Sequence, residues 1–128
     1  MKLIEVPPLI QINKNSSLFL IAKALNALPQ QVIAETPWSV ADEKPEIKFA
    51  IAYNKDCIFL KYYVKEKTIQ AKYLKTNDTV YKDSCVEVFV AFNGKKSYYN
   101  LEFNCLGTCR AGFGRISKTA SFYRHLRC

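Results

Sequence analysis

The chain has 128 residues, of which 49% are hydrophobic and 23% are charged. This is the balance of one globular domain, so a mainly disordered chain is excluded, and no apolar run approaches the roughly 18 residues of a membrane helix. The formal net charge of +8 is unevenly placed. Residues 1–109 carry 14 Lys and all 11 acidic residues, whereas residues 110–128 carry four Arg and one Lys without an acid.

The cysteines indicate free thiols. Their number is odd and no Cys-x-x-Cys pair is present, which disfavours a disulfide framework. The N-terminus does not have the pattern of a signal peptide, because its apolar stretch is short and is interrupted by Glu5 and by two prolines. As written, the chain is expected to be cytoplasmic, and a periplasmic or extracellular location stays open if the N-terminus is incomplete. The five cysteines are Cys57, Cys85, Cys105, Cys109 and Cys128.

Residues 16–28 have the pattern of an amphipathic helix. Ser16 or Ser17 can cap its start, and Pro29 follows its end. We expect this helix, within an N-terminal extension of residues 1–29, to pack on the domain rather than to bind a partner. Its apolar stripe consists of Leu18, Ile21, Ala22, Leu25 and Leu28.

From residue 47 onward the apolar pattern changes to the period of two that is typical of strands. The turn-rich segment before it contains Trp38, which we expect to anchor the core. Asn93-Gly94 is a strong hairpin signal between the last two apolar runs. We expect strands at about 47–52, 58–65, 69–74, 85–92 and 98–105.

Short strands at this spacing predict a mainly β fold, an antiparallel β-sandwich over residues 30–114 preceded by one helix. In the last predicted hairpin the two sides differ in chemistry. One side is apolar and is expected to face the core. The other carries carboxylates, carboxamides and a tyrosine, namely Glu87, Tyr98, Asn100, Glu102 and Asn104. These groups suit a ligand covered in hydroxyls, or they hydrogen-bond to one another across the strands.

Two runs resemble the family 9 carbohydrate-binding modules: Tyr81-Lys-Asp-Ser-Cys-Val-Glu-Val-Phe89 and Tyr98-Tyr-Asn-Leu-Glu-Phe-Asn-Cys-Leu-Gly-Thr108. The resemblance covers roughly residues 36–112. It implies a β-sandwich that binds glucan- or xylan-type sugars and supports polysaccharide breakdown without catalysis. Tyr81 stands six residues before Glu87, where the family often has a Trp that stacks on sugar. The second stacking aromatic of the family has no match here.

The resemblance implies a carbohydrate site made of Tyr81, Glu87, Tyr98, Asn100, Glu102 and Asn104. No cofactor is required. The family can carry structural calcium, to which Asp78 or Asp83 could contribute. We expect neither a nucleic-acid partner nor a membrane partner.

Two other classes of function stay open. Glu87 and Glu102 could face each other on paired strands, as the two carboxylates of a glycoside hydrolase do. The positive charge and the basic C-terminus would suit a nucleic-acid-binding β domain, although no motif of that class is present.

The C-terminus departs from the family. The resemblance fades near Gly114, and residues 115–128 form a basic tail that suggests a truncated or frame-shifted relative. We expect this tail to be mobile and dispensable for the fold. If later strands are missing, an open sheet edge would favour self-association.

Overall fold

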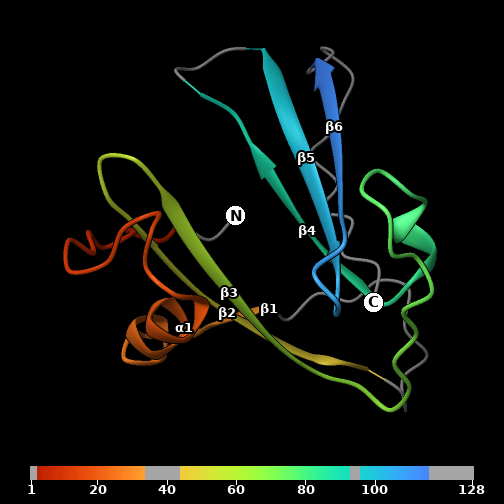
Figure 1. The fold of residues 1–128 in the computed structure, drawn as a ribbon, viewed down its shortest axis with the longest axis horizontal. Helices are drawn as coiled ribbons and strands as arrows, with labels where there is room; N and C mark the ends of the chain where they lie inside the picture. Colours follow the sequence, from red (N-terminus) through yellow and green to blue (C-terminus); the bar gives the residue numbers. More distant parts are fainter. Residues whose placement is uncertain (1–2, 34–43, 93–95, 116–128) are drawn as a thin grey trace. The chain divides into compact units, whose positions relative to one another are not determined.

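The structure is a computed structural model, and it describes residues 3–33, 44–92 and 96–115. Trp38, the Asn93-Gly94 turn and the tail after Arg115 lie outside the described residues. The chain divides into two compact units, Met1–Glu35 with Pro45–Lys65 and Thr36–Lys44 with Glu66–Cys128. Each unit contains one antiparallel three-stranded sheet (Figure 1).

The predicted mainly β fold with an N-terminal helix is confirmed. The order of strands is β1-β2-β3 in the first sheet and β4-β5-β6 in the second. None of the helices within the described ranges is long and apolar enough to cross a membrane. The elements are α1 (Leu18–Asn26), β1 (Gln31–Ile33), β2 (Glu46–Tyr53), β3 (Ile58–Lys65), the 3-10 turn η1 (Val80–Lys82), β4 (Cys85–Val90), β5 (Ser97–Asn104) and β6 (Cys109–Arg115).

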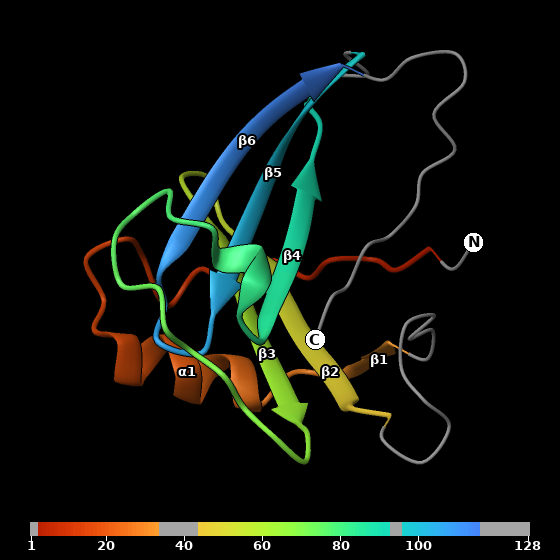
Figure 2. The same cartoon turned by 90° about the vertical axis from the view of Figure 1, so that its right-hand side faces the viewer.

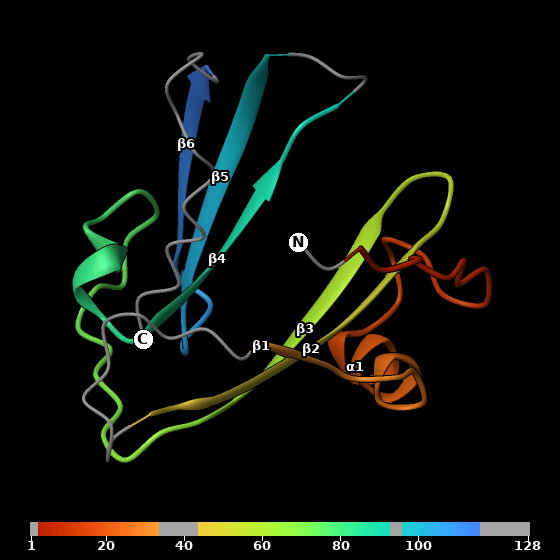
Figure 3. The ribbon, with the colours of Figure 1, turned by 180° about the vertical axis from the view of Figure 1, so that it is seen from behind.

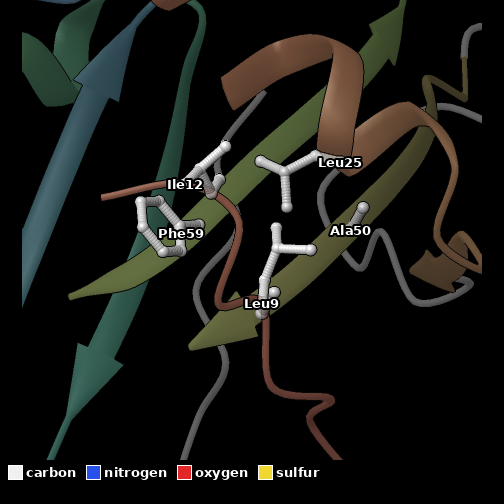
Figure 4. Packing of buried hydrophobic residues seen from close by; sticks show 6 residues of the cluster. Leu9, Ile12, Leu25, Ala50 and Phe59 are labelled. Carbon is white, nitrogen blue, oxygen red and sulfur yellow. The ribbon is translucent and has the colours of Figure 1, made fainter. Parts of the chain in front are cut away.

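The first unit buries α1 against β2 and β3. The Ser17 hydroxyl accepts a hydrogen bond of 3.3 Å from the backbone N–H of Leu20, which caps the start of the helix as predicted. Small side chains at Ala50 and Ala52, both fully buried, leave room for the helix on this face of the sheet. Figure 4 shows the resulting cluster, which consists of Leu9, Ile12, Leu25, Ala50, Ala52 and Phe59.

The second unit is the sheet β4-β5-β6, in which β5 is the central strand (Figure 3). Strands were predicted at 85–92 and 98–105, close to the observed β4 and β5. The strand β6 was not predicted, because Gly112 and Gly114 interrupt the apolar alternation there. Gly107 has a φ of +80° in the turn between β5 and β6, a conformation that favours glycine.

The strand predicted at 69–74 is wrong. No strand is present there, because the backbone N–H groups of Lys72 and Tyr73 donate to the side chain of Asp83 instead of to a neighbouring strand. The three hydrogen bonds to the two carboxylate oxygens measure 2.9–3.0 Å. A side chain thus replaces a strand partner along this segment.

Part of the outer edge of β6 is covered by Asn77. Its backbone N–H donates to the carbonyl of Cys109 at 2.9 Å, and its side-chain oxygen accepts from the N–H of Ala111 at 3.0 Å. Asn77 has a φ of +66°, in the left-handed region that asparagine tolerates better than most residues. On the outer side of β4, no described strand pairs with the sheet. Self-association through an open edge stays a prediction.

Candidate functional site

The candidate site lies on one side of the sheet β4-β5-β6, which we call the polar face. Residues directly opposite each other in an antiparallel pair share a face of the sheet, so the register defines its members. They are Cys85, Glu87 and Phe89 of β4, Tyr98, Asn100, Glu102 and Asn104 of β5, and Arg110, Gly112 and Gly114 of β6. The predicted polar residues of the two strands are thus on one face.

A row of charged side chains crosses the polar face at its middle. Glu87 is the direct partner of Glu102, and Glu102 is the direct partner of Arg110 on the next strand. Like charges directly opposite each other destabilise a sheet. The pair of Glu87 and Glu102 is therefore unfavourable by itself, whereas Arg110 places an opposite charge beside Glu102.

Glu102 is buried, with 9% of its surface exposed. Its Oε1 accepts a hydrogen bond of 3.1 Å from the side-chain amide of Asn100. Oε2 of Glu102 and Oδ1 of Asn100 are buried, and neither has a hydrogen-bond partner in the part of the chain that the structure describes. Buried acceptors are nearly always paired in proteins, so these two atoms are unusual.

Tyr81 belongs to η1, and its ring lies beside Arg110 at one end of this row. The guanidinium carbon of Arg110 lies 4.8 Å from the centroid of the Tyr81 ring, a cation–π arrangement. Arg110 is not among the predicted site residues, because the arginine-rich composition that begins there is typical of a basic tail. The available signal was the abrupt appearance of this arginine after 109 residues without one.

Asn104 and Asp83 hold η1 against the sheet. The amide of Asn104 donates to the carbonyl of Tyr73 at 2.8 Å and to Oδ2 of Asp83 at 3.0 Å. Its oxygen accepts from the N–H groups of Leu106 and Thr108. The hydrogen-bonding capacity of this buried amide is fully used, so the structure gives Asn104 a positioning role. Figure 2 shows η1 (the short green helical turn) beside β4 and β5.

Asp83 is ionised more readily than an ordinary aspartate. Burial opposes its ionisation. The hydrogen bonds from the backbone N–H groups of Tyr73 and Lys72 and from the side chain of Asn104 outweigh that effect, and they hold the pKa of Asp83 below its usual value of 3.8. The negative charge thus fixes the segment that leads into Tyr81.

Tyr98 lies over a glycine. A Cβ at Gly114 would come within 2.6 Å of Cζ of the Tyr98 ring, so this ring position requires glycine on the neighbouring strand. The ring also packs against Phe89, with centroids 5.5 Å apart. Tyr98 and Tyr81 are thus both held by contacts within this unit.

The opposite face of this sheet was predicted to belong to the core, and this is only partly correct. Val86, Val88, Leu101 and Phe103 are half-buried. Tyr99 is 48% exposed and Phe113 is 64% exposed, with ring centroids 5.2 Å apart. The aromatic end of this face is therefore open to solvent.

No cluster of three His, Cys, Asp or Glu side chains suited to a metal ion occurs within 3–33, 44–92 and 96–115. The two aspartates considered for calcium both accept hydrogen bonds from the backbone. Asp78 accepts from the N–H of Lys75 at 3.1 Å, and both oxygens of Asp83 are engaged as described above. Calcium binding at either residue stays a prediction.

Comparison with known proteins assigns the family. The model of carbohydrate-binding family 9 matches residues 19–123, and the chain belongs to this family. A crystal structure from Bacteroides uniformis ATCC 8492, of a protein proposed to bind carbohydrate, is similar to this chain at 30% identity and a TM-score of 0.77. The match covers 91% of this chain and 56% of that protein, so this chain spans little more than half the length of its relative. No curated protein matches the chain.

Proposed function

We propose that this chain binds carbohydrate without catalysis, on the polar face of β4-β5-β6 and the adjoining ring of Tyr81. Membership of carbohydrate-binding family 9 and the similarity to the Bacteroides protein support the class of ligand. The observation that carries the proposal is the row of Glu87, Glu102 and Arg110, which ends at the Tyr81 ring.

The chemistry of the row matches that of a sugar. A sugar hydroxyl both donates and accepts hydrogen bonds, whereas its ring presents C–H groups that pack on an aromatic face. Carboxylates accept, a carboxamide donates and accepts, and a guanidinium donates up to five hydrogen bonds in a planar fork. The polar face therefore offers partners for both functions of a hydroxyl.

Each predicted site residue has a role in this proposal. Tyr81 and Tyr98 supply rings, and the polar groups of the row bind hydroxyls together with Asn100. Asn104 acts indirectly, because its hydrogen bonds hold the segment that carries Tyr81. The ligands that we propose are glucan- or xylan-type sugars.

Calorimetric titration of the full chain tests the proposal. Glucose, cellobiose and xylobiose are titrated in turn, and at least one should give saturable binding. Glu87→Gln should weaken that binding by about tenfold, since hydrogen bonds to charged groups contribute about 1.5–3 kcal/mol. Glu5→Gln, which removes an exposed carboxylate in the other unit, is the matched control and should have no effect. Binding of none of the three sugars would count against the proposal.

A second candidate function is glycoside hydrolysis, because the register of β4 and β5 makes two glutamates direct partners. Direct partners in an antiparallel pair have Cβ atoms about 4.5–5.5 Å apart, and Glu87 and Glu102 are such partners. Retaining glycosidases hold their two carboxyl groups about 5–5.5 Å apart. Release of sugar from oligosaccharides by the wild-type chain, lost in Glu87→Gln, would replace the non-catalytic proposal.

A further inference from the structure

Two acceptor atoms on the polar face have no donor among residues 3–33, 44–92 and 96–115. They are the buried oxygens Oδ1 of Asn100 and Oε2 of Glu102. The amide nitrogen of Asn100 lies 3.1 Å from Oε1 of Glu102. Each unpaired oxygen shares a carbon atom with one of these two bonded atoms, so the unpaired oxygens belong to two side chains that are in direct contact.

Both atoms require a ligand group that donates. A carboxylate and an amide oxygen only accept, and leaving a buried acceptor unsatisfied costs free energy. Both atoms are shielded from bulk solvent, so a donor that reaches them pairs with acceptors that the described side chains leave unpaired. A group that cannot donate gains nothing at either atom.

We propose that Asn100 and Glu102 determine specificity, by selecting sugars that present two neighbouring unsubstituted hydroxyls. Each hydroxyl donates one hydrogen bond, one to Oδ1 of Asn100 and one to Oε2 of Glu102. This inference rests on the proposed carbohydrate function and deepens it. Sugars that are deoxygenated or substituted at either hydroxyl should therefore bind weakly. The same is expected of a uronic acid whose carboxylate stands in place of one of the two hydroxyls.

The charges of the row favour the same class of ligand. Glu87 and Glu102 are direct partners, so a further carboxylate next to them would be repelled. Arg110, the other partner of Glu102, offers donors to the oxygen of a hydroxyl that itself donates to Glu102. A neutral hydroxyl can thus donate to Glu102 and accept from Arg110, whereas an anionic group can only accept from Arg110.

Binding also requires that the two oxygens become accessible. Asn100 is half-buried rather than enclosed, so its amide can turn towards a ligand that reaches the polar face. Such a rotation breaks its hydrogen bond to Oε1 of Glu102. Binding therefore exchanges that one hydrogen bond for the two that the ligand donates.

A deoxyfluoro scan tests the inference with the wild-type chain. A sugar that binds in the titration above is compared with its monodeoxy and monodeoxyfluoro derivatives at each hydroxyl, and with its uronic acid. Fluorine keeps the size of a hydroxyl but cannot donate. We expect two neighbouring positions at which deoxy and deoxyfluoro derivatives both bind at least about tenfold more weakly. If the hydroxyl at C6 is one of these two positions, the uronic acid should also bind at least that weakly.

Variants connect these positions to the two residues. In Glu102→Ala, which has no polar group at this position, one of the two hydroxyls should lose its importance, so that the deoxy derivative and the parent sugar bind this variant equally. Asn100→Ala should have the same effect at the neighbouring hydroxyl. Glu5→Gln should preserve the full wild-type pattern.

The outcomes separate the inference from the proposed function. Wild-type binding that tolerates fluorine at every position overturns the inference and leaves carbohydrate binding intact. The same holds if Glu102→Ala keeps the whole deoxy pattern. If no sugar binds to the wild-type chain, both the proposed function and this inference are wrong. The scan itself needs only the wild-type chain, so a variant that fails to fold does not prevent the test.

Discussion

The side-chain amide of Asn104 donates a hydrogen bond of 3.0 Å to Oδ2 of Asp83, which joins the end of β5 to the residue that follows η1. Asp83 in turn accepts from the backbone of Lys72 and Tyr73. This pair fixes three separate segments at one point. The position of Tyr81, two residues before Asp83, depends on it.

Tyr81→Ala should reduce sugar affinity by more than tenfold, because a ring stacked on a sugar contributes more than one neutral hydrogen bond, which is worth about 0.5–1.5 kcal/mol. Titration calorimetry with the best-binding sugar measures the loss. Tyr99→Ala is the matched control, since Tyr99 is exposed on the opposite face of the same sheet. Unchanged affinity in Tyr81→Ala would remove Tyr81 from the site.

Asn104→Ala should destabilise the second unit by about 1–3 kcal/mol, because it leaves hydrogen-bonding groups of Tyr73, Leu106 and Thr108 without their partner. Thermal unfolding should show a lower Tm. The exposed Asn15 provides the control, and Asn15→Ala should leave the Tm nearly unchanged. If the two variants unfold at the same temperature, Asn104 has no positioning role.

Low pH should weaken the hydrogen bonds that the backbone N–H groups of Lys72 and Tyr73 donate to Asp83. The pKa of Asp83 is lower in the folded chain than its usual value of 3.8. Its ionised form therefore contributes stability above that usual value, and the contribution is lost as the pH falls through the lower folded pKa. Amide hydrogen exchange at Lys72 and Tyr73, corrected for the intrinsic rate at each pH, should accelerate in that range.

Asp83→Asn provides the comparison for the pH experiment. This variant should lack the part of the acid dependence that arises from Asp83, and it should be less stable than the wild-type chain at neutral pH. Glu46, whose pKa is lowered by its hydrogen bond with Lys48, keeps its own contribution in both proteins. Identical acid profiles for the two proteins would contradict the prediction.

Gly114→Ala should destabilise the chain, whereas Gly112→Ala should not. A Cβ at residue 114 lies 2.6 Å from the Tyr98 ring, whereas the nearest atom to a Cβ at residue 112 is Cβ of Asn100 at 3.8 Å. Gly114→Ala should displace the ring and cost about 1–3 kcal/mol. Gly112→Ala should be neutral or slightly stabilising, because glycine in a strand costs about 0.5–1 kcal/mol relative to alanine.

Thermal unfolding and the NMR signals of the Tyr98 and Phe89 rings measure the two glycine variants. The ring signals should shift in Gly114→Ala and stay in place in Gly112→Ala. Equal shifts and equal Tm values would show that the Tyr98 ring does not depend on Gly114.

Local patterns in the sequence determined much of this fold. The apolar stripe and the capping serine predicted α1, and the alternation after residue 47 predicted β2 and β3 together with their turn. The same alternation placed Glu87, Asn100 and Glu102 on one face of the later sheet. These features depend on periods of two and 3.6 residues, which neighbouring residues carry without help from the rest of the chain.

Only the tertiary structure decided the remaining features, because each depends on partners that are distant in the sequence. Lys72 is not in a strand because Asp83, 11 residues away, binds its N–H group. Gly112 and Gly114 give β6 no apolar alternation, and the strand exists through its pairing with β5. The sequence placed Arg110 and Tyr81 29 residues apart, and the folding of β6 and η1 onto the same sheet brought the guanidinium over the ring.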